Sequence, residues 1–324
     1  MPADAMDRGR REHISLPSVT AVILNTNRRM DTLACIASLI DDGYPRLQML
    51  ILDNGSTDGS IEAIQAEYPQ ARIHRLAENL GYAGNNNVGL RLALERGADW
   101  VLVLNEDVVL GADSIERMLG AAEGDERAGI VGPLVLHYDE PQVIQSAGGL
   151  LGAGWQSTHI GQNTDNQGQF NTPRQVDWVS GCCLLARRAM IEALGGFDER
   201  FFYYWEETEW CLRARRAGWR VYLVPTANVW HKGVQRNYQP GPNTTYYWGR
   251  NWLKMLAKHH APPSVWIIAL SILGRSLLSW TVRPKYRSQV PHRDALLEGI
   301  VDFARGRSGM RAGGRDAQRT GLQP

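Results

Sequence analysis

The feature that most constrains the fold is an apolar run at residues 100–104, which ends abruptly in Asn105, Glu106 and Asp107. A continuous run of Val and Leu is typical of a strand buried on both faces of a parallel sheet. Carboxylates at the carboxyl end of such a strand lie where open α/β sheets bind their ligands. The run therefore predicts either a ligand site or a plain polar turn, and the rest of the chain must distinguish them.

Three further strands and three helices alternate upstream of this run. The strands are expected at residues 19–24, 48–52 and 72–76, and the helices at residues 30–40, 61–68 and 88–96. Alternation at this spacing implies right-handed crossovers and a parallel sheet, which is a doubly wound α/β fold. The carboxyl ends of all four strands then lie along one edge of the sheet.

Polar and turn-forming residues follow the three upstream strands as well. They are Asn25, Thr26 and Asn27, then Asp53, Asn54 and Ser56, then Asn79, Gly81, Asn86 and Asn87. This edge is the expected nucleotide site of a doubly wound fold. Asp53 can accept a hydrogen bond from a base or a ribose, and it can equally be a local cap within its turn. Neither a Gly-x-Gly-x-x-Gly motif after the first strand nor a Walker-type phosphate loop occurs, so a dinucleotide cofactor is poorly supported.

The composition fits a globular protein of a reducing cytoplasm. At 324 residues the chain can bury a substantial core, and 35 Lys and Arg against 34 Asp and Glu give no reason to expect a nucleic-acid partner. The cysteines form no Cys-x-x-Cys pair, which argues against a disulfide framework or a zinc site. Residues 1–16 lack an apolar core, so we expect a disordered leader rather than a signal peptide, and residues 306–324 are expected to be a disordered tail.

Beyond Asp107 the alternation loosens, although further elements are expected. They are a helix at 114–121, a strand at 130–137, a long loop at 155–171, strands at 176–187 and 220–224, and a helix at 243–260. The loop is rich in Gly, Gln, Asn and Thr and is predicted to lie over the site. Gly181 interrupts its strand at a point where backbone could approach a ligand. A lone histidine such as His231 is more often packed than a ligand.

A second cluster of carboxylates, Glu206, Glu207 and Glu209, follows five consecutive aromatic residues at 201–205. The cluster begins a predicted helix, and acidic residues in a first turn suit the helix dipole. Glu209 can also pair with Arg213 one turn on, so a structural role could account for all three glutamates. Aromatic walls, however, raise the pKa of a carboxylate, as a general base requires.

Residues 264–282 form the most apolar segment of the chain and are expected to be helical. On a helical wheel, one face carries Trp266, Leu270, Leu273, Leu277 and Trp280, and the opposite face carries Ser264, Ser271, Arg275 and Ser279. Arg275 at mid-span would cost about 2.5–3.5 kcal/mol on an insertion scale, which disfavours a membrane span. Basic flanks and a Trp near each end fit a helix lying in the membrane interface. Packing on the preceding domain or on another subunit is equally open.

Four motifs, in this order, carry a resemblance to a known family. They are residues 53–60, residues 79–89, residues 104–107, and residues 195–202 leading into 206–209. Together they resemble the inverting, metal-dependent glycosyltransferases of family 2, which have the GT-A fold, and within these the rhamnosyltransferase-like branch. The resemblance runs from about Val19 to Lys258. It implies a Rossmann-like, doubly wound mixed sheet with a C-terminal helical extension.

The resemblance also implies a role for each candidate residue. Asp53 would bind the base of a nucleoside diphosphate sugar, Asn25, Thr26, Asn27, Asn54 and Ser56 would line its pocket, and Asn79, Gly81, Asn86 and Asn87 would shape the ribose and diphosphate wall. Asp107 and His231 would hold Mn²⁺ or Mg²⁺, with Glu106 and Gly181 close to the donor. Glu207, beside Glu206, would be the catalytic base, and Arg250 or Lys232 would add positive charge at the diphosphate.

Three departures from the family pattern stand out. Asn105 replaces the first acid of the metal motif, Glu207 replaces an Asp, and Asn85 stands where Gly is usual. These leave two other readings open, a sugar nucleotidyltransferase and a non-catalytic sugar-binding scaffold. The expected activity is transfer of rhamnose from dTDP-rhamnose to a glycan or lipid-linked acceptor, with UDP-galactofuranose, GDP-mannose and other UDP-sugars as further candidate donors.

The chain is accordingly expected to divide into four parts. These are the leader (1–16), a glycosyltransferase domain (17–260), a helical segment for membrane association or homo-oligomerisation (261–305) and the tail (306–324). Within the domain, a nucleotide-binding half (about 17–110) precedes an acceptor half (about 111–260). The expected location is the cytoplasm, at the inner face of the cell membrane.

Overall fold

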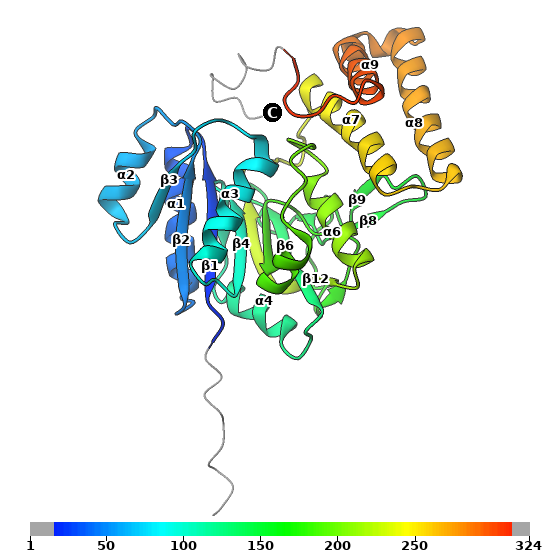
Figure 1. Cartoon of the computed structure of the whole chain (residues 1–324). Helices are drawn as coiled ribbons and strands as arrows, with labels where there is room; N and C mark the ends of the chain where they lie inside the picture. The colour runs from blue at the N-terminus through cyan, green and yellow to red at the C-terminus, as the bar shows by residue number, and fades with distance from the viewer. Residues whose placement is uncertain (1–15, 313–324) are drawn as a thin grey trace, which may run out of the picture.

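The computed structural model describes residues 16–312, and a mixed sheet of ten strands runs through the centre of this part of the chain (Figure 1). Its strands are β1 (Val19–Asn25), β2 (Leu47–Asp53), β3 (Arg72–Arg75), β4 (Trp100–Asn105), β5 (Val108–Leu110), β6 (Ala128–His137), β7 (Ile144–Ser146), β10 (Arg174–Gln175), β11 (Cys183–Arg187) and β12 (Arg220–His231). The main order is β3-β2-β1-β4-β11-β6-β12-β10, with β5 beside β12 and β7 beside β6. Two more short strands, β8 (Gly149–Leu151) and β9 (Ser157–His159), form a separate pair.

The helices up to residue 216 pack around the sheet, and those from residue 242 on form a separate group beside it (Figure 1). The helices are α1 (Arg29–Asp42), α2 (Ser60–Glu67), α3 (Gly81–Glu95), α4 (Ser114–Ala122), α5 (Arg188–Leu194), α6 (Glu206–Arg216), α7 (Pro242–Lys258), α8 (Pro263–Val282), η1 (Pro284–Gln289) and α9 (Val290–Ala304). Alternate residues of β1 point to opposite sides: Ile23 packs in the cluster with α1, and Val22 in the cluster with α3. Such two-sided burial explains why these strands are continuous apolar runs.

The strands β1 to β4 form the parallel sheet that the sequence predicts. β1, β2, β3 and β4 are all parallel, with β1 between β2 and β4. Asn25 lies opposite Asp53, and Leu24 lies opposite Asn105. The polar residues that follow these strands therefore share one edge of the sheet, and the α/β fold class is confirmed.

Helix α3 begins seven residues earlier than the predicted residue 88, so residues 81–87 are helical rather than a loop. Gly81 opens it with φ of +75°, and a side chain there would collide with Phe202. The Asn85 side chain accepts a hydrogen bond of 3.0 Å from the backbone N–H of Leu80. The polar, glycine-rich composition that predicted a loop is thus a helix start whose amides satisfy local backbone groups.

Two predicted strands of the second half have different lengths in the structure. The strand expected at 176–187 is regular only in β11, because Gly181 and Cys182 form a turn before it. The strand expected at 220–224 continues as β12 to His231, with an irregularity between Val224 and Asn228 in its pairing with β6. This extension sets His231 opposite Val108 of β5, directly after Asp107.

The C-terminal helices stand at the opposite end of the molecule from α2 and β3 (Figure 1). Helices α7, α8 and α9 pack together around a core that includes Trp252, Leu256, Leu273 and Leu296. The first residues of the predicted tail also belong here, since the Gly309 carbonyl accepts a hydrogen bond of 2.7 Å from Arg250. The expectation of disorder is therefore wrong for residues 306–312, and residues 1–15 and 313–324 lie outside the described residues.

Helix α8 is apolar on both its inner and its outer side. Leu273 is buried inward, whereas Leu270, expected on the same face of the helix, is 52% exposed. The other exposed large apolar residues of this helix are Ile267, Leu278 and Val282. Helix α8 is long and apolar enough to cross a membrane by length and composition, with a mean hydropathy of 1.6 in its most apolar window. The helical wheel places Leu270 on the same face as Leu273. Leu270 is nevertheless exposed, because α9 covers only part of the apolar surface of α8.

Candidate active site

Polar side chains from the ends of β1 and β2 form one hydrogen-bonded network. Asn25 donates to Ser56 Oγ over 2.9 Å, and Ser56 Oγ also accepts from the backbone N–H of Asn27 at 3.1 Å. Asn54 donates to Thr26 Oγ1 at 3.2 Å, which ties the two strand ends together a second time. The structure therefore brings the predicted base-pocket residues together and fixes their rotamers.

Asp53 performs the local role that its turn suggests. It is buried, and its Oδ1 accepts the backbone N–H of Ser56 over 3.0 Å. This bond shapes the turn after β2 and leaves Asp53 beside the network of Asn25 and Asn27. A base-binding role for Asp53 is compatible with this geometry, because a carboxylate can accept several hydrogen bonds at once.

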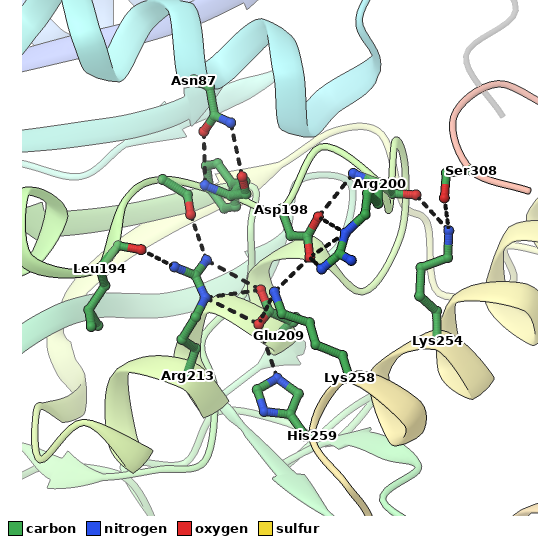
Figure 2. Close-up of polar contacts among 12 residues, drawn as sticks. Asn87, Leu194, Asp198, Arg200, Glu209, Arg213, Lys254, Lys258, His259 and Ser308 are labelled. Atoms are coloured by element: carbon green, nitrogen blue, oxygen red, sulfur yellow. Dashed lines mark hydrogen bonds and ion pairs between the residues drawn. The ribbon is translucent and has the colours of Figure 1, made fainter. Parts of the chain in front are cut away.

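The asparagines around the start of α3 have different environments. Asn79 Oδ1 accepts the backbone N–H of Gly81 at 2.9 Å, and the buried Asn86 donates to the Tyr82 carbonyl at 3.0 Å. Asn87 instead donates to the Phe197 carbonyl at 2.9 Å and accepts the Phe197 N–H at 2.8 Å (Figure 2). Asn87 therefore does not line the donor wall as predicted, because both ends of its amide bind the loop before α6.

Asp107 and His231 meet where β5 and the end of β12 pair. Asp107 Oδ1 lies 3.2 Å from His231 Nε2. Both side chains are largely buried, and Asp107 Oδ1 makes no hydrogen bond of normal geometry. A side chain at Gly233 would collide with the Asp107 carboxylate and approach His231 Nε2 to 3.3 Å. A buried acceptor without a donor, an imidazole beside it and a glycine that keeps the space open fit a divalent cation.

Neighbouring polar groups orient this pair. The Gln145 amide lies 3.1 Å from His231 Nδ1, and when its Oε1 accepts the Nδ1 proton, the Nε2 lone pair faces Asp107. Arg28 donates to Asp107 Oδ2 over 3.0 Å. Burial alone would raise the pKa of Asp107, but the nearby His231 imidazole and the Arg28 guanidinium hold it below its ordinary value. Asp107 is therefore ionised and ready to bind a cation.

Two groups of the metal motif differ in environment from Asp107. Glu106 is buried, and burial together with the Asp107 charge raises its pKa to about 8. Asn105 lines the cavity described below, which Glu106 does not. Among the described residues, no group of three or more His, Cys, Asp or Glu side chains is placed to hold a metal. Any ion held by Asp107 and His231 therefore needs the remaining ligands from substrate and water.

A cavity of about 770 Å³ lies beside this pair, and both predicted catalytic glutamates line it. Burial raises the pKa of Glu207, and burial plus the Glu207 charge raises that of Glu206 further. Oε2 of Glu206 has no hydrogen-bond partner. The backbone before α6 has positive φ at Phe202, Tyr204 and Trp205, of 65°, 67° and 77°. Strain of this kind in non-glycine residues concentrates at functional sites, where the surrounding packing maintains it.

The third glutamate of the cluster belongs to a separate, fully paired group (Figure 2). Glu209 accepts from Arg213 Nε at 3.2 Å, from Lys258 Nζ at 2.7 Å and from His259 Nε2 at 3.0 Å. Lys258 also reaches Asp198 at 2.6 Å. Burial alone would raise the pKa of Glu209, but these partners lower it to about 2. This Glu209 cluster, formed with Arg213, Lys258, His259 and Asp198, joins α6 to α7 and to the loop that Asn87 contacts. It contains the predicted Glu209–Arg213 pair.

Arg250 does not add charge at the diphosphate as predicted. Its side chain is fully buried, and it donates to the Phe201 carbonyl at 3.1 Å and to the Tyr246 hydroxyl at 3.1 Å. It also stacks on the rings of Tyr246 and Tyr247. An Arg in a predicted helix is expected to be exposed to solvent. Arg250 is buried instead, because α9 and residues 306–312 cover it.

Several residues of the site carry no signal in the sequence taken alone. Tyr82 lines the cavity and donates to the Gly181 carbonyl at 2.5 Å, and Gly181 itself lies beside Glu207. Gln145 and Arg28 contact the Asp107–His231 pair from distant segments. Tyr82 and Arg28 each stand within or next to a polar strand-end segment, which is the one feature that could have pointed to them. Nothing comparable marks Gln145.

The mixed sheet, with Asp107 and His231 at its edge and two glutamates in the cavity beside them, has the GT-A fold of glycosyltransferases. A structure of GalNAc-T7 with UDP, GalNAc and Mn²⁺ matches this fold with a TM-score of 0.61 at 15% identity, over 75% of this chain and 48% of that one. The chain thus spans about half the length of that structure. At this identity the likeness shows the fold alone.

The sequence profile described as Glycosyl transferase family 2 matches residues 20–195, and the chain belongs to this family. It is 34% identical to N-acetylglucosaminyl-diphospho-decaprenol L-rhamnosyltransferase of Mycobacterium tuberculosis, over 73% of this chain and 80% of that protein. It is 24% identical to dTDP-rhamnosyl transferase RfbF of Shigella flexneri, over 92% of this chain and 98% of that protein. The protein is therefore a glycosyltransferase, and its relatives include rhamnosyltransferases.

Proposed function

We propose that the protein transfers rhamnose from dTDP-rhamnose to a lipid-linked sugar, with inversion at the anomeric carbon, in the synthesis of a cell-surface polysaccharide. The names of the two rhamnosyltransferase relatives support the donor sugar, and that of the mycobacterial relative supports a lipid-linked acceptor. The observation that carries the reaction type is Glu207, a cavity-lining carboxylate with a raised pKa.

The chemistry requires one base and no enzyme nucleophile. Glu207 accepts the proton of an acceptor hydroxyl while that oxygen forms its bond to the anomeric carbon. The bond from this carbon to the diphosphate oxygen breaks in the same displacement, and the electron pair leaves with the nucleoside diphosphate. Burial suits Glu207 to the task, because a raised pKa makes the carboxylate a stronger base at neutral pH.

The departing diphosphate needs positive charge on the opposite side of the reacting carbon. A divalent cation bound by Asp107 and His231 would supply it, as Lewis acid and charge neutraliser. Two cations of the chain lie close by: Arg28 contacts Asp107 at 3.0 Å, and Lys232, the residue after His231, contacts Asp31 at 3.0 Å. Mn²⁺ is the better candidate than Mg²⁺, because one of the two protein ligands is an imidazole.

The outer side of α8 is the proposed contact with the inner face of the cell membrane. Ile267, Leu270 and Leu278 are exposed along it, and exposed cations follow at Arg283, Lys285 and Arg287. An apolar strip flanked by basic residues suits the boundary between acyl chains and anionic headgroups. A lipid-linked acceptor would reach the enzyme at such a surface.

The deciding experiment measures nucleotide release from dTDP-rhamnose, UDP-galactofuranose, GDP-mannose and UDP-glucose, with and without Mn²⁺. We expect release from dTDP-rhamnose that depends on the metal and rises when a lipid-linked acceptor is added. Release of the same rate from another donor would refute the donor assignment. Unchanged release after chelation of the metal would refute the role of the Asp107–His231 pair.

A further inference from the structure

The cavity beside Glu207 extends from the sheet edge to the C-terminal helices. At one end it is lined by Asn105, Gly181 and His231, which come from the glycosyltransferase domain. At the other end its walls are Ser276 and Trp280 of α8, Gln289 of η1, and His292 and Leu296 of α9. The family profile stops at residue 195, so the far end of the cavity is built by a part of the chain that the profile does not describe.

The lining has the chemistry of a site for a neutral sugar. Aromatic rings project from several elements, among them Tyr204, Trp205, Trp248 and Trp280. The polar groups between them are hydroxyls, amides and imidazoles, and among the described lining residues the only carboxylates are Glu206 and Glu207. None of these lining residues is a Lys or Arg. Away from the cation proposed at His231, a phosphate group would therefore find no Lys or Arg here, whereas the apolar face of a pyranose packs well on amphipathic rings.

Trp280 and His292 form the far wall as one unit. Their ring centroids lie 6.3 Å apart, and His292 Nδ1 lies 2.8 Å from Thr245 Oγ1 on α7. This hydrogen bond holds the imidazole between α7 and α9, and its Nε2 remains as the second polar atom of the ring. Gln289 is half-buried at the end of η1 and contributes an amide to the same wall.

We propose that α8, η1 and α9 form the acceptor end of the catalytic cavity. In this site Trp280 packs against the sugar that receives the transferred residue, and Gln289 and His292 hydrogen-bond its hydroxyls. The inference rests on the proposed function and adds to it the residues that select the acceptor. It also assigns α8 two sides with separate tasks, since Ile267, Leu270 and Leu278 face outward while Ser276 and Trp280 line the cavity.

The cations of this region agree with such a division. Arg283, Lys285 and Arg287 are exposed between α8 and α9, outside the cavity lining. In this arrangement the phosphate that links an acceptor sugar to its lipid would meet these cations, which lie in the chain between the lining residues Trp280 and Gln289, while the lipid would lie along the outer side of α8.

The test uses the full chain and a soluble acceptor, N-acetylglucosamine linked through diphosphate to a short alkyl chain, so that membrane binding does not limit the rate. Trp280→Ala should raise the KM for this acceptor by about tenfold, the upper range for loss of one aromatic contact. The KM for the nucleotide sugar should change less than twofold. Gln289→Ala should raise the acceptor KM by about threefold, the low end of a neutral hydrogen bond.

Trp266→Ala is the matched control, because Trp266 is a half-buried tryptophan of the same helix that packs on Phe303 and is not among the cavity-lining residues. It should leave both KM values unchanged. Equal acceptor KM values for the wild type and Trp280→Ala would overturn the inference, as would equal increases in both tryptophan variants. If Trp280→Ala does not fold, Trp280→Phe and Gln289→Ala replace it. The same comparison then applies, namely the increase in acceptor KM against the increase in nucleotide-sugar KM. Absence of nucleotide release from every donor would instead refute the proposed function.

Discussion

Glu207 and Glu209 lie half a turn apart on α6, yet their carboxyl groups have opposite electrostatic environments. Glu207 lines a cavity together with Glu206, and burial raises its pKa. Glu209 is fully buried among Arg213, Lys258 and His259, and these partners lower its pKa to about 2. Burial is common to both, so the difference comes from whether cations accompany the carboxylate into the protein.

The comparison shows how one helix start can hold both a reactive group and its support. An unpaired buried carboxylate destabilises the fold and is a better base, whereas a carboxylate with several cationic partners is chemically inert and holds elements together. The Glu209 cluster fastens α6 to α7 and to the loop at Asp198. Residues 202–205, whose strained backbone precedes Glu206 and Glu207, lie in the chain between Asp198 and Glu209, which both belong to this cluster.

The largest expected effect separates the two glutamates by function. Glu207→Gln keeps the shape of the side chain and removes the base, so transfer should fall by about 10²–10⁴-fold. The Kd for dTDP-rhamnose, measured by calorimetry, should remain within about twofold, because the proposal assigns Glu207 to the acceptor hydroxyl and not to the donor. Full turnover by this variant would show that another group is the base.

The second prediction separates them by stability. Glu209→Gln leaves Lys258 and Arg213 with a neutral partner in a buried site, and breaking a buried pair of this kind typically costs about 3–5 kcal/mol. Urea unfolding at pH 7 measures the loss. Glu95→Gln is the control, because its ion pair with Arg91 is exposed and should contribute at most about 0.5 kcal/mol. Equal losses in the two variants would refute a supporting role for the cluster.

The same pair of glutamates predicts two opposite pH dependences. The base works only when ionised, so kcat should fall as pH decreases through a value above 4.5, the ordinary pKa of a glutamate. Glu209 has a depressed pKa, so its stabilising contribution is present above 4.5 and is lost as pH falls from there towards about 2. Activity should therefore disappear at a higher pH than folded structure, which paired rate and circular-dichroism titrations would test.

The order of strands and helices follows from sequence because it depends on local periodicity. The apolar runs of β1 and β4 indicate strands that are buried on both faces, and the polar residues after them indicate where the edge of the sheet lies. The individual contacts of Asn87 and Arg250 do not follow, because each is decided by a segment far away in the chain. Asn87 meets Phe197, and Arg250 meets Gly309. Periodicity predicts which side of a helix is buried, but it does not predict which other segment of the chain packs against that side.

The same limit explains the outcome for the site. Asp107 and His231 meet within 3.2 Å, as the family resemblance implies, but their positioning neighbour Gln145 stands 86 positions from His231 in the chain. The end of β12 carries His231 to this place through an irregular pairing that no local pattern announces. The resemblance therefore points to Asp107 and His231 as candidates, whereas the residue that orients them is visible only in the folded structure.

The smallest expected effect concerns Glu206, which shares the cavity with Glu207 but has an oxygen without a partner. Its raised pKa means that ionisation above pH 4.5 costs the folded state free energy, so a neutral amide of the same shape removes that cost. Glu206→Gln should leave the free energy of unfolding at pH 7 unchanged or raise it by about 1 kcal/mol, while Glu209→Gln lowers it. Urea unfolding of both variants side by side measures this sign. If Glu206→Gln lowers the free energy of unfolding as much as Glu209→Gln does, Glu206 must also have cationic partners. Glu207 would then be the only one of the three glutamates without them.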